Sequence, residues 1–109
     1  MKLYFYRYVN SKQAIIERAA EVKETEKTYK AMPDARTFPF MYKSKMLKTD
    51  LNKCESFISD MICVLDHADT DAARKIFLEY ATRRMNAAQD EMSMWAGRAR
   101  GIKNAGVTA

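Results

Sequence analysis

The chain has 109 residues, of which 48% are hydrophobic, and 19 Lys and Arg residues against 14 Asp and Glu residues give a net charge of +5. This length fits one domain with a real core but little spare surface, which disfavours a deep catalytic cleft in a single chain. No apolar run approaches the roughly 18 residues that cross a membrane, which excludes a membrane span. We therefore expect a single domain, residues 1–109, and a binding protein rather than an enzyme.

Charge is distributed unevenly along the chain. Residues 1–53 have a net charge of +6, residues 54–91 a net charge of −4, and the segment from Met92 a net charge of +3. A basic first half and a basic tail are compatible with a polyanion partner such as nucleic acid. A modest positive charge also serves solubility alone, so both interpretations stay open.

The segment from Leu3 to Val9 is the clearest predicted strand, because aromatic and aliphatic residues alternate in it without a breaker. Alternation places its tyrosines on one face. They form either a platform on which exposed bases stack or one face of a central strand covered on both sides. We favour the covered central strand. The tyrosines are Tyr4, Tyr6 and Tyr8.

The segment from Gln13 to Met32 fits two structures. Its apolar residues are spaced as one stripe of an amphipathic helix. It also fits a strand from Ile16 to Lys23, a turn, and a second strand from Lys27 to Met32. Periodicity alone does not decide between them.

After a loop at Pro33, we expect a short strand at the edge of the sheet. Aromatic residues at 38, 40 and 42 alternate there with Met41, Lys43 and Lys45. The lysines either form a basic binding edge or only deter pairing with another sheet edge. The predicted sheet thus has three or four mainly antiparallel strands within residues 1–48.

We expect a buried helix over residues 50–68. Asn52 followed by Glu55 has the spacing of a capping box, and the apolar residues that follow cover a wide surface. In such a helix Cys54 and Cys63 lie on nearly opposite faces and cannot form a disulfide. Together with the lack of a signal peptide, this indicates a cytoplasmic protein.

A second, long helix is predicted from Thr70 to Gly97. Thr70 and Asp71 form a start signal, no proline follows, and Gly97 is expected to end the helix. Its apolar residues recur with the period of one helical face. The residues of this stripe are Ala73, Ile76, Phe77, Tyr80, Ala81, Ala88, Met92 and Trp95.

The distal part of this long helix is expected to be an interface. At roughly 40 Å, the helix is longer than a small sheet can cover. Flexible methionines beside an aromatic anchor suit contact with a protein target or a second copy, and a homodimer is our preferred arrangement. The expected interface residues are Met85, Met92, Met94 and Trp95.

Basic residues that could contact phosphates fall into three groups. Such contacts give affinity without sequence choice, although exposed arginines are more typical of a solvated helix face. After Gly97 we expect a mobile basic tail, residues 98–109. The candidates are Arg36, Lys43, Lys45 and Lys48 near the sheet edge, Arg83 and Arg84 on the long helix, and Arg98, Arg100 and Lys103 in the tail.

Cys63 and His67 have the spacing of two metal ligands on a helix. Because Cys54 would face away, too few ligands remain, and we expect neither a metal nor a cofactor. His67 as a general base would need a positioned nucleophile and an orienting acid, and Ser59 and Asp66 are candidates by composition only. A metal-dependent enzyme is thus the weakest of the functions considered, and no catalytic residue is assigned.

Two stretches resemble small proteins encoded by phages and prophages: Glu24–Tyr29 and Tyr42–Leu51. In those proteins a strand, a turn and a threonine-tyrosine strand precede a basic strand that runs into a helix. The resemblance covers about the first half of the chain and favours strands in residues 16–32. It implies a protein of the bacterial host cytoplasm, in a group that includes anti-CRISPR inhibitors of bacterial defence and DNA-binding regulators.

Residues and resemblance together predict an α+β protein with a small sheet, a buried helix and a long helix. The predicted function is that of a non-enzymatic, phage-type binding protein that inhibits a bacterial defence nuclease, in the first place a CRISPR effector. The alternative is a small basic DNA- or RNA-binding accessory or regulatory protein.

Overall fold

The computed structural model describes residues 1–57 and 59–104. Six β-strands come first and one long α-helix follows. The elements are β1 (Lys2–Val9), β2 (Ala14–Glu24), β3 (Thr28–Ala31), β4 (Lys45–Leu47), the 3-10 helix η1 (Lys48–Asp50), β5 (Cys54–Phe57), β6 (Asp60–Leu65) and α1 (Thr70–Asn104). The description does not extend to the side chains of Phe57, Met94, Trp95, Arg98, Arg100, Lys103 and Asn104.

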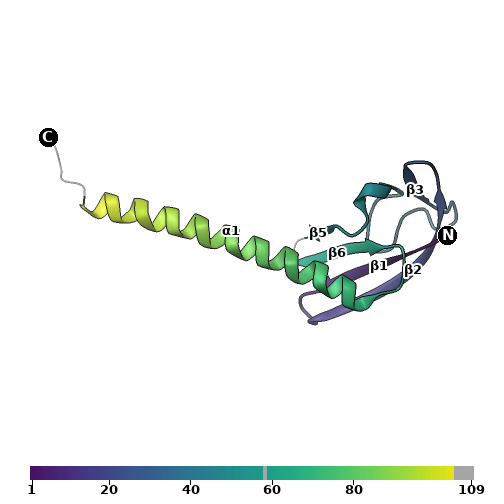
Figure 1. Ribbon diagram of the computed structural model, residues 1–109, viewed down its shortest axis with the longest axis horizontal. Helices are drawn as coiled ribbons and strands as arrows, with labels where there is room; N and C mark the ends of the chain where they lie inside the picture. Colours follow the sequence, from purple (N-terminus) through teal and green to yellow (C-terminus); the bar gives the residue numbers. More distant parts are fainter. Residues whose placement is uncertain (58, 105–109) are drawn as a thin grey trace. The chain divides into compact units, whose positions relative to one another are not determined.

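The strands form one antiparallel sheet in the order β4-β3-β2-β1-β6-β5. Figure 1 shows β1 between β2 and β6 in this sheet. β1 pairs with β2 over its full length, from Lys2 opposite Glu21 to Val9 opposite Ala14. On its other side β1 pairs with β6, which comes last of the strands in the sequence. β1 therefore joins the β5–β6 hairpin to the rest of the sheet.

The sheet curls into a half-barrel around a set of buried side chains, the inner cluster. Met46 of β4 and Val64 of β6 both belong to it, although their strands are four positions apart in the sheet. In a flat sheet that separation would be roughly 19 Å, too far for contact. The inner cluster consists of Leu3, Phe5, Val22, Tyr29, Phe38, Met46 and Val64.

The other face of the sheet packs against the first turns of α1. Tyr6 and Cys63 are buried on this side, together with Ala73 and Phe77 of the helix. Leu65 completes this outer cluster. β1 is thus buried on both faces, which confirms the predicted central strand. The tyrosine platform is wrong, because Tyr6 has no exposed surface.

Helix α1 is tied to the sheet at its start. Asp69 caps the helix: its carboxylate accepts a hydrogen bond from the Ala72 N–H at 3.0 Å, and its carbonyl accepts one from the Ala73 N–H at 3.1 Å. The Tyr6 hydroxyl accepts from the Asp69 N–H at 2.8 Å and donates to Glu17 of β2 at 2.9 Å. One hydroxyl therefore links β1, β2 and the helix start.

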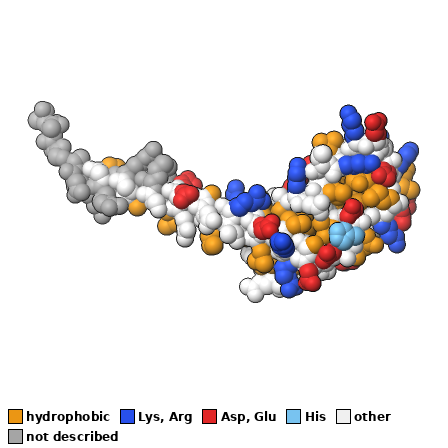
Figure 2. All heavy atoms as spheres, in the orientation of Figure 1, with side chains coloured by type: hydrophobic (Ala, Val, Ile, Leu, Met, Phe, Trp, Pro, Cys, Tyr) orange, Lys and Arg blue, Asp and Glu red, His pale blue; other side chains and the backbone are white. Residues whose placement is uncertain are grey.

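The chain divides into two units, Met1–Leu78 and Glu79–Ala109. The first holds the sheet and the first turns of α1. In the second, α1 continues, and every residue from Ala81 to Ser93 is exposed. Figure 2 shows hydrophobic side chains recurring along this part of the helix.

The expectation of a three- or four-stranded sheet followed by two helices is wrong. The sheet has six strands, and residues 50–68, predicted as a buried helix, contain β5 and β6. The apolar run Met61–Leu65 has no period that separates a buried strand from a buried helix. Val64 faces the inner cluster and Cys63 the outer cluster, so the run is a strand buried on both faces.

The predicted helix signals near Asn52 have other roles. Asn52 adopts a positive φ of 62° before β5 and donates its N–H to the Val64 carbonyl at 3.0 Å. Cys54 and Cys63, expected on opposite helix faces, are directly opposite each other on β5 and β6. Both are thiols, and burial raises the pKa of Cys63 to about 12.

Residues 13–32 form a hairpin of β2 and β3, which decides between the two structures that this segment fits. The strand expected around residues 38–42 is a loop, in which Phe38 is buried and stacks on Phe5 with ring centres 5.3 Å apart. Phe40 in this loop has a φ of 64°. The strand at this edge of the sheet is instead β4, which comes after the loop.

Helix α1 does not end at Gly97. It continues to Asn104, so residues 98–104 of the predicted tail are helical, and residues 105–109 lie outside the described part. A glycine within a helix costs only about 1 kcal/mol, and no proline follows Gly97 to stop the helix.

Tyr6→Phe is expected to lower the free energy of unfolding by about 1–2 kcal/mol, because the Asp69 N–H loses its acceptor. Urea unfolding followed by circular dichroism measures the change. Tyr8→Phe is the matched control, since the contact described for Tyr8 is that of its ring with Phe77. An equal loss in both variants would contradict the role of the Tyr6 hydroxyl.

Asp60 ties the start of β6 to the end of β1. Its carboxylate accepts a hydrogen bond from the Asn10 N–H at 3.1 Å and binds the Arg7 guanidinium at 2.9 and 2.7 Å. These bonds, that of Asn10 first, lower the pKa of Asp60 below its ordinary 3.8. A lowered folded-state pKa stabilises the fold above the ordinary value, and this is lost as pH falls through the lowered value.

Asp60→Asn is therefore expected to destabilise the protein at neutral pH and to approach the wild type in strongly acidic solution. The measurement is the urea midpoint of both proteins from about pH 7 down to about pH 2. A difference that stays constant over this range would show that the Asp60 charge is not the stabilising element.

Candidate functional site

Three lysines lie side by side on neighbouring strands. Lys23 of β2 is directly opposite Lys30 of β3, and Lys30 is directly opposite Lys45 of β4. Residues opposite each other in an antiparallel sheet point to the same face. With strands about 4.8 Å apart, these three residues span about 10 Å. We call this set the lysine row.

The lysine row lies on the outer face of the half-barrel. Strand alternation places it there, because each lysine is next in sequence to a residue that is buried in the inner cluster. The three lysines themselves are exposed. The buried neighbours are Val22, Tyr29 and Met46.

The lysine row is positively charged, and no carboxylate in the described part of the chain neutralises it. Among the residues that the structure describes, none of the three lysines forms an ion pair. Like charges directly opposite each other destabilise a sheet. The fold nevertheless places two such pairs next to each other, so the row favours an external negative charge.

Protection of the sheet edge accounts for only one of these lysines. β4 is an edge strand, and Lys45 on it deters pairing with another chain. Lys30 and Lys23 lie on β3 and β2, which have a strand on each side. A lysine there protects no edge, so the complete row requires another explanation.

Two of the predicted basic residues are engaged within the fold. The Lys43 ammonium donates to both carboxylate oxygens of Glu55, at 3.0 and 3.2 Å. Lys48 binds Glu24 at 2.8 Å, and its ammonium lies 5.5 Å from the centre of the Tyr29 ring. The ammonium groups of Lys43 and Lys48 are therefore less available to an external phosphate than those of the lysine row.

The other predicted site residues lie on separate elements. Lys45 is in the lysine row, and Arg36 is exposed in the loop before β4. Arg83 and Arg84 are exposed on the second unit. Met85 and Met92 on the same helix are 59% and 72% exposed. The remaining candidates belong to α1 by their backbone, and their side chains lie outside the described part: Met94, Trp95, Arg98, Arg100 and Lys103.

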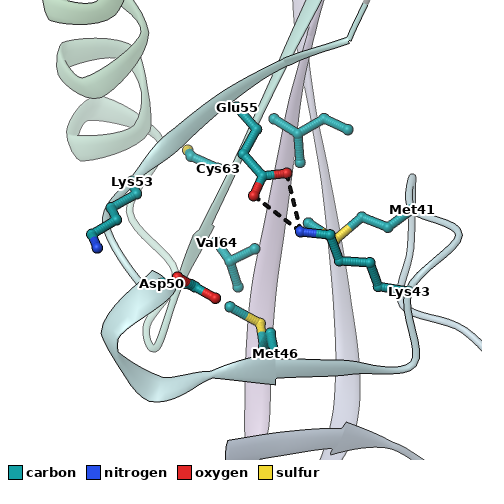
Figure 3. Close-up of a pocket in the computed structure, with 9 residues that line it drawn as sticks. Met41, Lys43, Met46, Asp50, Lys53, Glu55, Cys63 and Val64 are labelled. Carbon is teal, nitrogen blue, oxygen red and sulfur yellow. Dashed lines mark hydrogen bonds and ion pairs between the residues drawn. The ribbon is translucent and has the colours of Figure 1, made fainter.

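The pocket between the two sheet edges is closed by the ion pair of Lys43 and Glu55 (Figure 3). Glu55 lies on β5, and Lys43 comes shortly before β4. The space that they share with Met46 and Val64 has a volume of about 20 Å³. That is room for one water molecule, not for a substrate or cofactor.

Two larger hollows, of about 430 and 180 Å³, open beside the loop at residues 37–42. Their linings are mainly aromatic and aliphatic, and both include Phe40, Met41 and Tyr42. Of the residues described, no His, no Cys and no pair of carboxylates lines either hollow. The smaller hollow is also lined by Lys43 and Glu55, which bind each other in an ion pair.

Cys63 and His67 are not on one helix. Cys63 is buried in β6, whereas His67 follows β6 and is exposed. The His67 Nδ1 atom lies 2.7 Å from the Asp66 carboxylate, and this bond raises the pKa of His67. No three His, Cys, Asp or Glu side chains of the described part come together as a metal site.

Sequence reasoning misses Lys23 and Lys30 because they become neighbours only when the strand register is fixed. The β2–β3 register has a local signal, since the Thr28 N–H donates to the Thr25 hydroxyl in the turn. The pairing of Lys30 with Lys45 spans the loop of residues 32–44. No local pattern predicts that pairing.

No protein family, curated protein or solved structure matches this chain. In the described part of the chain, no helix is long and apolar enough to cross a membrane.

Lys30→Glu is expected to raise the free energy of unfolding by about 0.5–1 kcal/mol at low salt, because two like-charge pairs become attractive. The gain should shrink between about 20 and about 500 mM salt, as screening increases. Urea unfolding at both salts measures it. Lys12→Glu in the β1–β2 turn is the charge-matched control. If Lys30→Glu gains no more stability than Lys12→Glu, repulsion within the row is contradicted.

Proposed function

We propose that this protein is a non-enzymatic accessory protein that binds the phosphate backbone of nucleic acid. The observation that carries the proposal is the lysine row: Lys23, Lys30 and Lys45 are exposed, directly opposite one another, and without an ion-pair partner in the described part. A polyanion relieves the repulsion along the whole row. A single carboxylate of a partner protein relieves only part of it.

The spacing of the lysine row suits a nucleic-acid backbone. Duplex DNA carries one negative charge per roughly 1.7 Å of helix axis. A row about 10 Å long therefore meets enough phosphates for each of its ammonium groups. Contacts to phosphates carry no base information, so the expected binding is independent of sequence.

We also propose that the protein acts as a homodimer through the distal part of α1. Met85 and Met92 are 59% and 72% exposed in the single chain. Apolar side chains that repeat along one exposed helix are typical of a helix that docks on a partner. A dimer carries two lysine rows and doubles the number of phosphate contacts.

The resemblance to phage proteins supports a different proposal, inhibition of a defence nuclease such as a CRISPR effector. It rests on Glu24–Tyr29 and Tyr42–Leu51. With a net charge of +5, such an inhibitor would not act as a nucleic-acid mimic, because mimicry requires a negative surface. A pull-down of a purified effector tests this proposal: capture without guide RNA favours inhibition, and capture only with guide RNA favours nucleic-acid binding.

Fluorescence anisotropy of a labelled DNA duplex tests the phosphate-binding proposal. With three contacts, the affinity is expected to fall roughly 40-fold between about 50 and about 200 mM salt. Two duplexes of unrelated sequence should bind equally well. Absence of binding at the lower salt would overturn the proposal.

The decisive variant changes Lys23, Lys30 and Lys45 to Gln. It should bind at least tenfold more weakly at about 50 mM salt and show a flatter salt dependence. The matched control changes Lys12, Lys53 and Lys75 to Gln, which removes the same charge from exposed positions outside the row. An equal loss in both variants would show that net charge, not the row, binds the duplex.

A further inference from the structure

A second apolar row runs along α1. From Leu78 onward, apolar residues recur at alternating steps of three and four, which is the heptad pattern of a coiled coil. The pattern holds over three heptads without a polar residue. The members of this heptad row are Leu78, Ala81, Met85, Ala88, Met92, Trp95, Ala99 and Ile102.

The heptad row is separate from the helix face that covers the sheet. At about 100° per residue, the helix residues of the outer cluster and those packed beside them (Ala72, Ala73, Ile76 and Phe77) lie on average roughly 110° around the helix from the row. A narrow row with this spacing is typical of a two-stranded seam rather than of a wide core face. Its large described members are exposed by 59–76%: Leu78, Met85, Met92 and Ile102.

Arg84 and Glu91 flank this row one heptad apart, both immediately before a methionine of the row. Side chains three and four residues apart are neighbours on a helix. The positions at these distances from Arg84 and Glu91 hold only Ala, Met, Tyr or Trp. Neither residue therefore has an opposite charge within reach on its own helix.

A parallel pair of helices would not use these charges. When heptad positions are lettered a to g, the heptad row occupies a and d, and Arg84 and Glu91 occupy g. In a parallel coiled coil each g residue lies beside the e residue of the next heptad on the other helix. Two of the resulting pairs would be uncharged on one side and the third would be repulsive. The pairs are Arg84 with Gln89, Glu91 with Ala96, and Arg98 with Lys103.

An antiparallel pair brings g positions beside g positions, because the second helix runs in the opposite direction. One alignment then places Arg84 of each copy beside Glu91 of the other, which gives two symmetric ion pairs. The same alignment sets Met85 against Ala88 and Met92 against Ala81. A long side chain thus meets a small one in each of these central layers, whereas the outermost layers set Leu78 against Trp95.

We infer that two copies of this protein pair antiparallel through the heptad row, with Arg84 of each copy beside Glu91 of the other. This inference rests on the proposed homodimer and adds its orientation and register. It does not depend on phosphate binding by the lysine row.

Charge exchange tests the register, with sedimentation equilibrium of the full chain as the measurement. Arg84→Glu alone and Glu91→Arg alone each turn two attractive contacts into two repulsive ones and are expected to weaken the dimer about tenfold. The double variant, in which both charges are exchanged, should dimerise like the wild type. Failure of the double variant to recover would overturn the register.

The chain offers matched controls at the neighbouring positions. Arg83→Glu and Asp90→Arg make the same charge changes one residue earlier, on the side of the helix away from the heptad row. They should leave the dimer unchanged. Equal weakening by Arg83→Glu and Arg84→Glu would show that net charge, not a specific contact, controls association.

Disulfide trapping tests the orientation. An antiparallel seam places Met85 beside Ala88 of the other copy, so Met85→Cys and Ala88→Cys proteins should cross-link when mixed and not when oxidised separately. Each protein cross-linking to itself would indicate a parallel dimer and overturn the inference. Wild-type protein, which retains Cys54 and Cys63, sets the background.

The outcomes separate the two levels of the proposal. A wild-type chain that stays monomeric at high concentration overturns the homodimer together with its register. If the wild type dimerises and the single charge changes do not weaken the dimer, the register alone is overturned. DNA binding is measured independently by anisotropy in either case.

Discussion

Burial of β1 on both faces is the constraint on which the rest of this structure depends. Leu3 and Phe5 on one face and Tyr6 on the other have no exposed surface. Such a strand needs a neighbour on each edge, which β2 and β6 supply, and a cover on each face. The curled sheet covers the inner face and α1 the outer one. The Tyr6 hydroxyl cannot remain unsatisfied when buried, and its bonds to Glu17 and Asp69 fix where the helix begins.

Curling around the inner cluster also determines where charge can be placed. The inner cluster fills the concave side of the sheet. The ion pair of Lys43 and Glu55 spans the gap between the two sheet edges. Lysines of the short strands β3 and β4 must therefore point outward, and the alternation that buries Tyr29 exposes Lys30. The pairing register then sets the lysines opposite one another. The lysine row is thus a consequence of the same packing that stabilises the sheet.

Sequence patterns predict the elements whose signals are local, namely the strand at β1 and the start of α1 near Thr70. They do not predict β6, because an apolar run such as Met61–Leu65 becomes a strand only through its pairing with β1. In the long helix, sequence patterns also do not predict which apolar residues are buried. A period of 3.6 assigns Phe77 and Met92 to one stripe, whereas the structure buries Phe77 against the sheet and leaves Met92 exposed. Lys30 and Lys45 likewise meet through a long-range pairing that no local signal contains.

The two proposed surfaces support each other through the number of contacts they provide. For three phosphate contacts, the logarithm of the binding constant falls with the logarithm of the salt concentration with a slope of about −2.7. One row therefore binds weakly at physiological ionic strength. Two copies joined by the heptad row bring six lysines. Where both rows reach one duplex, the second row binds at the high effective concentration set by the first, and the overall affinity rises without any new kind of contact. A small sheet with one modest row of lysines therefore gains most from a helix that pairs two copies.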